Sequence, residues 1–171
     1  MDRNSAVVFS TILLSAITLS TQAAQAQKAK HASKVAMAPP PAASGCDASL
    51  WNHVYNPKRL QQVSPCASVT GVITESNPES DGDQHLLLRL DPGQGNLTNK
   101  RNAKKKGGDI VIEFVCANPT SVKKAKGACA GYANRIPIPK VGAHVRVTGT
   151  YVLDSHNGWT EIHPVSKVDA M

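Results

Sequence analysis

Five segments of the chain alternate between apolar and polar residues in the way that β-strands do. They cover residues 67–76, 84–91, 109–116, 143–154 and 159–168. Successive side chains of a strand point to opposite faces, so Leu86, Leu88 and Leu90 share one face of the second segment. His85 lies on the opposite face of that segment. The pattern predicts a mainly β domain whose strands each have an apolar and a more polar face.

Two stretches before and between these strands have a different character. In "SLWNHVYN", residues 49–56, the apolar positions have helical spacing, and Asp47 or Ser49 is a suitable N-cap for a short helix. Residues 92–108, "PGQGNLTNKRNAKKKGG", are polar and rich in glycine. This composition predicts a long loop between the second and third strands.

A second short helix is expected in residues 118–134, where Thr120 or Ser121 would begin it and Gly131 would end it. The resulting order is three strands, a helix and two strands. That is the order of the OB-fold, a five-stranded Greek-key barrel. The main alternative is an open β-sandwich with the same number of strands.

Interior glycines favour the barrel. Gly71 and Gly149 end two copies of "VTG" inside the first and fourth predicted strands. A glycine within a strand often marks a bulge or a sharp bend, and the strands of a small barrel must bend to close. We therefore predict a five-stranded OB-fold-like Greek-key barrel with one or two short helices, in which the two "VTG" copies lie on paired strands.

The first residues of the chain have the layout of a secretory signal peptide. Arg3 precedes an apolar run over residues 6–19, and small residues lead to a cleavage site after Ala26. The apolar run has about 14 residues, whereas a membrane span needs ~20. We therefore favour a cleaved signal over residues 1–26 to a membrane anchor, and expect no membrane span after cleavage.

The remaining chain divides into a spacer and one domain. Residues 27–45 are rich in alanine, proline and lysine and have no apolar period, so a flexible linker is expected. Residues 46–171 then form a single domain, long enough to bury a core.

All four cysteines lie in this domain: Cys46, Cys66, Cys116 and Cys129. An exported chain with an even number of cysteines is typical of disulfide-bonded proteins. Three connectivities are possible, of which the two local pairs close the shortest loops. A four-thiolate zinc site is the alternative, but the close Cys-x-x-Cys pairs of such sites are missing. We expect disulfides and a secreted or periplasmic bacterial protein.

Five short motifs are more specific than the overall pattern: "WNHVYNPKRL", "VTGVI", "DGDQH", "VTGTYVLD" and "GWTEIHPV". Together they resemble an uncharacterised group of exported bacterial proteins with an OB-fold-like domain. The resemblance covers most of residues 46–168, and the "GW-x-EIHPV" ending is its most specific part. It implies the same fold and no particular activity.

Acidic and histidine side chains gather in two of these motifs. "DGDQH" contains Asp81, Asp83 and His85, and "GWTEIHPV" contains Glu161 and His163. The alternation of the strands places both histidines and the glutamate on the outer face of the barrel, with the two aspartates in the turn before the second strand. These five residues are the candidate metal ligands.

A metal site requires these side chains to converge on one ion, and carboxylate and imidazole ligands would suit Zn, Mn or Ca. In the usual barrel order the third strand separates the second from the fifth. Convergence would therefore have to include the outward-pointing Glu113. The simpler interpretation, which we favour, is a "DGD" turn with histidines that are solvated or paired with acids.

No motif in the sequence indicates catalytic residues. The chain has no nucleophile elbow, Gly-rich phosphate loop, HExxH motif or Cys–His dyad spacing. A binding function is therefore favoured over an enzyme. A divalent metal is the one cofactor that the sequence suggests.

The formal charge of the chain is +7, and its excess is concentrated on both sides of the third strand. The basic residues there are Lys100, Arg101, Lys104, Lys105, Lys106, Lys123, Lys124 and Lys126. They could attract nucleic acid or another polyanion to the outer face that OB-folds commonly use. Few aromatic residues are available to stack bases, and solvated lysines are the simpler alternative.

Three functional hypotheses follow. The favoured one is an exported binding module for nucleic acid or another polyanion. The second is a metal-dependent hydrolase or nuclease-like enzyme that uses the acid and histidine residues. The third is a periplasmic structural or partner-binding protein without catalysis.

Overall fold

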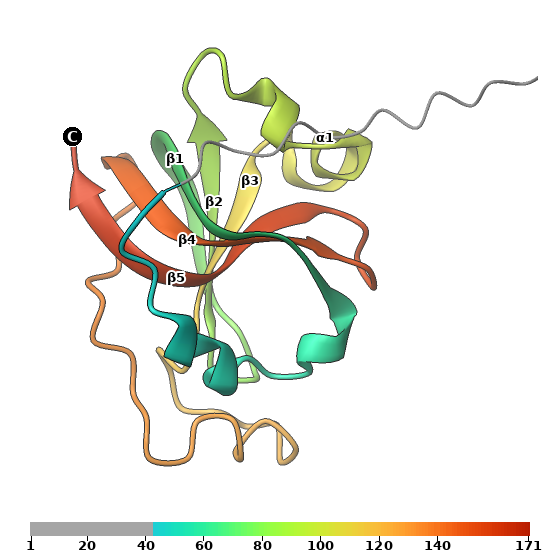
Figure 1. Cartoon of the computed structure of the whole chain (residues 1–171), viewed down its shortest axis with the longest axis vertical. Coiled ribbons are helices and arrows are strands. Elements are labelled where there is room, and N and C mark those ends of the chain that lie inside the picture. The colour runs from blue at the N-terminus through green and yellow to red at the C-terminus, as the bar shows by residue number, and fades with distance from the viewer. Residues whose placement is uncertain (1–42) are drawn as a thin grey trace, which may run out of the picture. The chain divides into compact units, whose positions relative to one another are not determined.

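The computed structural model describes residues 43–171, so the predicted signal peptide (1–26) and most of the predicted linker (27–45) lie outside the described residues. The five strands are β1 (Leu60–Pro78), β2 (Gln84–Leu90), β3 (Ile110–Phe114), β4 (His144–Asp154) and β5 (Thr160–Ala170) (Figure 1). They pair in the order β1-β2-β3-β5-β4, and β4 pairs again with β1 to close the barrel. The β3–β5 pairing is parallel and the others are antiparallel, so the sheet is mixed. The prediction of a mainly β domain with five strands is confirmed.

The interior glycines allow the strands to approach closely. The two "VTG" copies lie opposite each other on β1 and β4, as predicted. A Cβ atom on Gly71 would overlap the backbone carbonyl of Arg89, and one on Gly149 would overlap the carbonyl of Pro164. The register of the β4–β5 pair shifts at Gly149. Both glycines are therefore required by the close packing of backbone against backbone.

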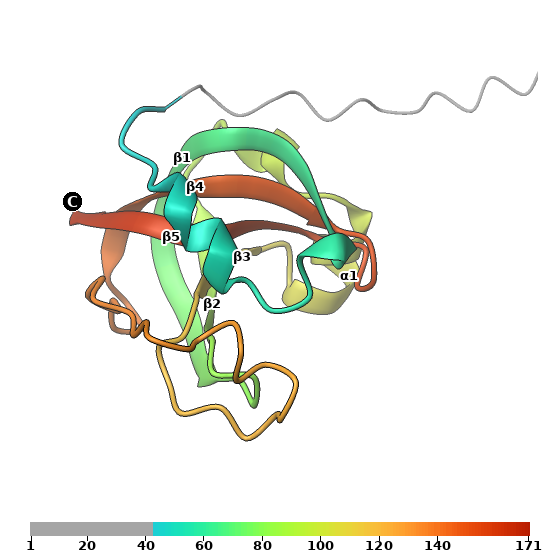
Figure 2. The ribbon, with the colours of Figure 1, turned by 60° about the horizontal axis from the view of Figure 1, so that its bottom comes forward.

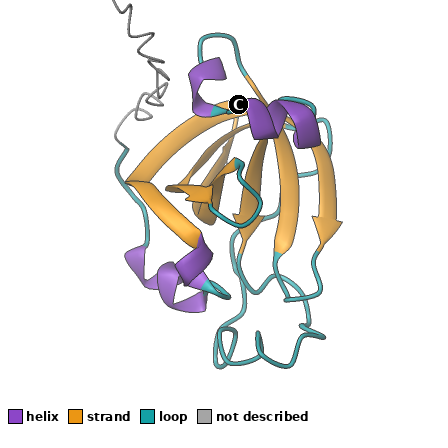
Figure 3. Ribbon diagram, turned by 90° about the vertical axis from the view of Figure 1, so that its right-hand side faces the viewer, coloured by secondary structure: helices purple, strands orange, loops and turns teal. Residues whose placement is uncertain are grey.

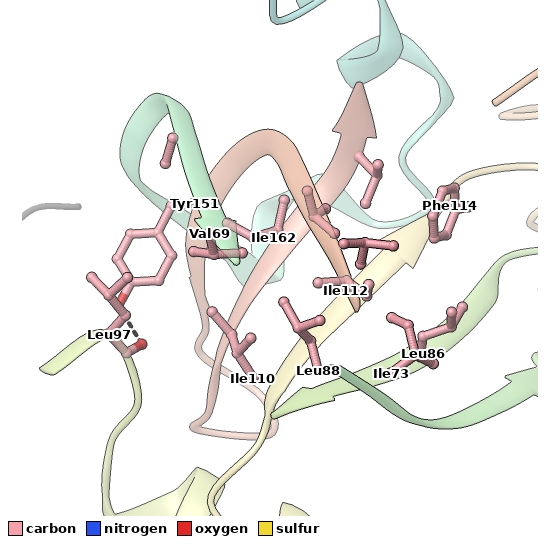
Figure 4. Close-up of a cluster of buried hydrophobic side chains, with 14 residues drawn as sticks. Val69, Ile73, Leu86, Leu88, Leu97, Ile110, Ile112, Phe114, Tyr151 and Ile162 are labelled. Atoms are coloured by element: carbon pink, nitrogen blue, oxygen red, sulfur yellow. Dashed lines mark hydrogen bonds between the residues drawn. The ribbon is translucent and has the colours of Figure 1, made fainter. Parts of the chain in front are cut away.

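Apolar side chains from all five strands fill the interior of the barrel. Figure 4 labels Val69, Ile73, Leu86, Leu88, Leu97, Ile110, Ile112, Phe114, Tyr151 and Ile162. The predicted alternation holds in β2 and β3, whose inward residues are fully buried except Leu90 at the end of β2, which is partly buried. The one polar group of this set, the Tyr151 hydroxyl, donates to the backbone carbonyl of Leu97 at 2.8 Å. The inner face of the barrel is thus apolar and satisfied.

The helix between β2 and β3 was not predicted. Helix α1 (Lys100–Lys106) forms within residues 92–108, so the prediction of a long loop there is wrong. The Asn99 side chain caps its first turn, and the Asn102 side chain returns to the Asn99 backbone N–H. Gly107 ends the helix with φ of 64°. Asparagine replaces the usual Glu or Gln of a capping box, which weakens the sequence signal.

The helix predicted for residues 118–134 is also wrong. The segment after β3 is a chain of turns, with hydrogen bonds such as that from the Ala125 N–H to the Val122 carbonyl at 3.0 Å. The disulfide between Cys116 and Cys129 closes this series of turns into a loop. The three short 3₁₀-helices are η1 (Ala48–His53), η2 (Pro57–Arg59) and η3 (Gly95–Leu97). Asp47 caps η1, as expected.

Both disulfides join local pairs. Cys46 bonds to Cys66, and Cys116 bonds to Cys129, which is the connectivity with the shortest loops. The prediction that the cysteines form disulfides is confirmed. Each bridge restricts the unfolded chain and is worth roughly 3 kcal/mol by a loop-entropy argument.

Candidate metal centre

Three neighbouring strands bring acidic and histidine side chains into one row on the outer face of the barrel. His85 on β2 lies opposite Glu113 on β3 in the antiparallel register. In the parallel register of β3 and β5, Val111 lies opposite Glu161. Two positions further along both strands, the same register sets His163 beside Glu113. Glu113 is thus the link between β2 and β5 that the sequence required.

This outer face is covered by protein. Helix η1 lies against β5, and its neighbourhood contributes Leu50 and Val54 to a second apolar cluster with Val115 and Val152 (Figure 2). As a result, Glu161 and His163 are 0 % exposed and Glu113 is 6 % exposed. The prediction that these side chains point away from the barrel interior is correct. Of the two environments expected for His163, solvated or paired with acids, the structure shows the second, because the ring is fully buried beside Asp83, Glu113 and Glu161.

Asp83 approaches the row from the turn before β2. Its Oδ1 atom accepts a hydrogen bond from the Cys116 backbone N–H at 2.9 Å. Its backbone carbonyl accepts hydrogen bonds from the Asn118 side chain and the Glu79 N–H. Its second oxygen, Oδ2, is buried and has no hydrogen-bond partner within residues 43–171. The loop after β3 therefore fixes the carboxylate while one of its oxygens faces the cluster.

Three carboxylates surround the imidazole ring of His163. Its Nδ1 atom lies 3.1 Å from Glu113 Oε2 and 3.9 Å from Glu161 Oε1, and its Nε2 atom lies 3.7 Å from Asp83 Oδ2. None of these contacts has the geometry of a hydrogen bond. Among the described residues, neither ring nitrogen and neither Glu161 oxygen has a hydrogen-bond partner. We name Asp83, Glu113, Glu161 and His163 the acid–histidine cluster.

Burial of several acidic side chains close together changes the pKa values of the cluster residues. Burial raises the pKa of Asp83 to about 6, against the opposing effect of His163. Burial also raises the pKa of Glu113, and Glu161 and Asp83 raise it further. For His163 burial alone would lower the pKa, but the three carboxylates outweigh it and raise that pKa. Three acids facing one imidazole leave a deficit of positive charge.

A pocket adjoins the cluster on the side of helix α1. It has a volume of about 260 Å³, and of the four cluster residues Glu113 lines it. Its other walls include Arg59, Lys106 and Trp159. The Lys106 ammonium lies 4.2 Å from the centre of the Trp159 ring. Helix η1 therefore covers one side of the cluster, whereas on the other side the pocket lets a small ligand reach Glu113.

Two of the five predicted ligands do not join the cluster. Asp81 remains in the turn, where its Oδ1 accepts a hydrogen bond from the Asp83 N–H at 3.3 Å, and it lines the pocket. His85 is buried, and its Nε2 atom lies 3.2 Å from Lys106 Nζ. Burial, followed by the charge of Lys106, lowers the pKa of His85 to about 4, so its ring is neutral at pH 7. Asp83, Glu161 and His163 do converge, together with Glu113.

Acidic and histidine residues whose ligand atoms lie within 4.8 Å of one another could hold a metal ion, and Asp83, Glu113 and His163 form such a group. Glu113 was recognised from the alternation of β3 but not counted as a ligand. Arg59 was not identified at all. Its position beside the cluster depends on the path of the chain from η2 into β1, for which the sequence carries no pattern.

The eight basic residues are not brought together. Lys100, Arg101, Lys104, Lys105 and Lys106 lie on helix α1, ahead of β3. Lys123, Lys124 and Lys126 lie in the loop that follows β3. This loop region lies at the end of the barrel opposite helix α1 (Figure 1 and Figure 3). Of the five on α1, only Lys106 lines the pocket beside the cluster.

No protein-family model matches the chain, and its sequence matches no curated protein closely. No helix within residues 43–171 has the length and apolar character needed to cross a bilayer.

Proposed function

We propose that this domain binds a divalent metal ion through Asp83, Glu113 and His163, with Glu161 as a further carboxylate at the same centre. The observation that supports this most strongly is the environment of His163. Its ring is fully buried, three carboxylates lie within 4 Å of its nitrogens, and neither nitrogen has a hydrogen-bond partner in the described part of the chain. Buried polar groups without partners are rare in folded proteins unless a ligand or ion satisfies them.

The charge of the cluster supports a metal more than a network of protons. Buried carboxylates are costly unless they are paired, and one imidazolium cannot pair with three of them. A divalent ion would supply two positive charges and bond directly to the oxygens that have no partner.

The ligand set favours particular ions. Imidazole is a good ligand for zinc and other transition metals, and carboxylates also suit manganese and calcium. One histidine with two or three acids fits Mn²⁺ or Zn²⁺ better than Ca²⁺, which prefers oxygen ligands alone. The pocket that reaches Glu113 would leave one position of the ion open. Structural metal sites are closed, whereas catalytic and ligand-binding sites keep such a position.

We further propose that the barrel is an OB-fold and that the chain is exported. The strand order, with parallel β3 and β5 and with β1 paired to both β2 and β4, supports the OB-fold assignment. The two disulfides support an oxidising compartment such as the periplasm or the cell exterior. The resemblance to exported bacterial proteins points in the same direction.

Calorimetric titration of the full mature chain with MnCl₂, ZnCl₂ and CaCl₂, after treatment with a chelator, tests the metal centre. We expect one Mn²⁺ or Zn²⁺ per chain, and at least ~10-fold weaker binding for His163→Ala, because this substitution removes a ligand. His144→Ala is the matched control. His144 is an exposed histidine on β4 that pairs with Asp91, remote from the cluster in sequence and contacts.

A second variant guards against misfolding of His163→Ala. Glu161→Gln keeps the shape of the side chain and removes one charge, so it should fold and should also weaken the metal. Absence of heat with all three metals would overturn the proposal. Equal affinities for the wild type, His163→Ala and His144→Ala would overturn it as well.

A further inference from the structure

The pocket beside the cluster has a composition that the metal centre alone does not explain. It holds two basic side chains, Arg59 and Lys106, next to the carboxylate of Glu113. Lys104 and Lys105, the neighbours of Lys106 on α1, are exposed, whereas Lys106 is half-buried against the barrel. Of these three lysines, Lys106 is thus the one whose side chain lies in the pocket and is partly shielded from solvent.

Uncharged groups hold Lys106 in place. Its ammonium lies 3.2 Å from His85 Nε2 and over the ring of Trp159. The imidazole accepts a hydrogen bond and the indole offers the negative face of its ring, but neither carries a negative charge. Within residues 43–171 Lys106 forms no ion pair with an acid. Its positive charge is therefore oriented in the pocket and is not neutralised there.

Arg59 offers a second set of donors. Its Nη1 atom lies 3.2 Å from Asp154 Oδ2, and this ion pair holds one end of the guanidinium in place. Its Nε atom is buried and lacks a hydrogen-bond partner in the described part of the chain. Arg59 lines the pocket together with Glu113 and Asp81, so it lies beside the cluster. A guanidinium fixed at one end is well suited to bind an oxyanion with its remaining donors.

The acidic residues and the volume of the pocket limit the charge and the size of a ligand that can bind. Glu79 and Asp81 line it and carry negative charge, so they repel an extended polyanion. The volume of about 260 Å³ lies below the range of about 300–1,000 Å³ that is typical of pockets for drug-sized ligands. A ligand that fits must be small, with one compact anionic group and a neutral, polar remainder.

We infer that the pocket binds the phosphate group of a small phosphate ester, with Lys106 and Arg59 as donors to its oxygens and the metal centre at its side. Divalent ions held by one or two carboxylates commonly complete their coordination with phosphate oxygens, and Arg and Lys are the usual partners of phosphate. This inference rests on the proposed metal centre, because a bound ion would offset the carboxylates that otherwise repel phosphate.

Calorimetry with the Mn²⁺-loaded full chain and glycerol phosphate as the probe tests the inference. We expect saturable binding, and at least ~10-fold weaker binding for Lys106→Met, because a charged hydrogen bond is lost. Lys105→Met removes the same charge from the adjacent, exposed position and should bind like the wild type. Lys105→Met should also leave the affinity for Mn²⁺ within about threefold of the wild-type value, since the electrostatic effect of a single exposed charge is small.

The outcomes separate the two proposals. Failure of the wild type to bind Mn²⁺ overturns the metal centre. Normal Mn²⁺ binding without binding of glycerol phosphate overturns the phosphate pocket alone, as does equal weakening by Lys105→Met and Lys106→Met. Vesicles that contain phosphatidic acid distinguish a lipid source. Binding to these vesicles without binding to glycerol phosphate would overturn the assignment to a small ester.

Discussion

The inner and outer faces of β2, β3 and β5 are almost equally buried, but their chemistry is opposite. Inside the barrel lie Leu88, Ile112 and Ile162, which need no partner once water is excluded. Outside it lie Glu113 and His163, which are almost as inaccessible. Burial of the inner residues stabilises the fold through the hydrophobic effect. Burial of the outer residues removes them from water without providing hydrogen bonds, which is costly.

This difference separates what the fold requires from what it tolerates. Any apolar side chains of suitable volume would fill the inner face. For the outer face, hydrophobic residues under η1 would stabilise the chain more than three acids around one histidine do. The presence of these polar groups therefore supports the proposed metal centre, in which a bound ion would satisfy them.

The largest effect on stability is expected on the inner face. Phe114→Ala should lower the free energy of unfolding by about 3–5 kcal/mol, because it removes a fully buried ring and leaves a cavity. Urea denaturation of the metal-free chain measures this change. A loss below about 1 kcal/mol would show that the barrel interior is less tightly packed than described.

The two disulfides should differ in their effect on the outer face. Replacement of either pair by alanine should cost roughly 3 kcal/mol of stability, by the loop-entropy argument. Only the loss of Cys116–Cys129 should also weaken the metal, because the Cys116 N–H orients Asp83. Metal titration of both double variants is the measurement. Equal metal affinities in the two variants would show that the Cys116–Cys129 disulfide is not needed to position Asp83 for metal binding.

The pH dependence of the free energy of unfolding should reveal the protonation of Glu113 and His163 on the outer face. The pKa values of Glu113 and His163 are both raised in the folded chain, for His163 to about 9. Above the ordinary histidine pKa of about 6.5, the folded state therefore holds protons that the unfolded chain has released. The metal-free domain should lose stability, on the order of 1–2 kcal/mol, as the pH rises from 7 to 9.

His85 opposes this trend only slightly near pH 7, since its pKa is lowered to about 4 in the folded chain and an ordinary histidine is already mostly neutral at pH 7. Denaturation in the presence of a chelator at pH 7, 8 and 9 provides the test. A stability that rises or stays level over this interval would contradict the assignment of the raised pKa values. Bound metal should reverse the trend, because its ligands must lose their protons to bind it.

Glu161→Gln should have a small effect on stability and a larger one on binding. Removal of one buried charge should leave the free energy of unfolding unchanged or raise it by up to ~1 kcal/mol. Metal affinity should nevertheless fall at least ~10-fold. Thermal unfolding and metal titration of the same variant compare the two quantities. A marked loss of stability would mean that Glu161 is required by the fold itself.

The exposed basic residues should show the smallest effect. Lys104→Gln and Lys105→Gln together should change stability by less than about 0.5 kcal/mol, because these side chains extend into solvent. Binding of a polyanion remains a separate prediction for them. If both contact a single-stranded nucleic acid, the double variant should reduce the slope of log K against log salt by about 1.4. An unchanged slope would exclude α1 from such an interface.

The alternation of apolar and polar residues was sufficient to predict five strands, the inner face of β2 and β3, and the outward direction of Glu113, Glu161 and His163. The glycines of the two "VTG" copies indicated correctly that β1 and β4 pair. The even number of cysteines indicated disulfides, but the sequence alone did not choose among the three connectivities. These features depend on residues that are close in sequence or on a period that one strand displays by itself.

The remaining features depend on contacts between distant segments. Strand parity shows which way Glu161 points, but its burial depends on η1 folding over β5. Helix α1 formed in a segment whose glycines and polar residues predicted a loop, because Asn102 is fully buried between α1, β3 and β5 and donates to the carbonyls of Asp109 and Thr160. A capping role carried by buried asparagine has no distinct sequence pattern. Arg59 reached the pocket through a turn that the sequence does not specify.

A crystal structure of the chain grown with MnCl₂, with anomalous diffraction measured, tests the metal centre. We expect one strong anomalous peak at about 2–2.3 Å from a nitrogen of His163 and from oxygens of Asp83 and Glu113. Diffraction data that show no peak there, with the ring of His163 instead hydrogen-bonded between carboxylates, would contradict the metal centre. That result would identify the outer face as a buried proton network that belongs to the fold.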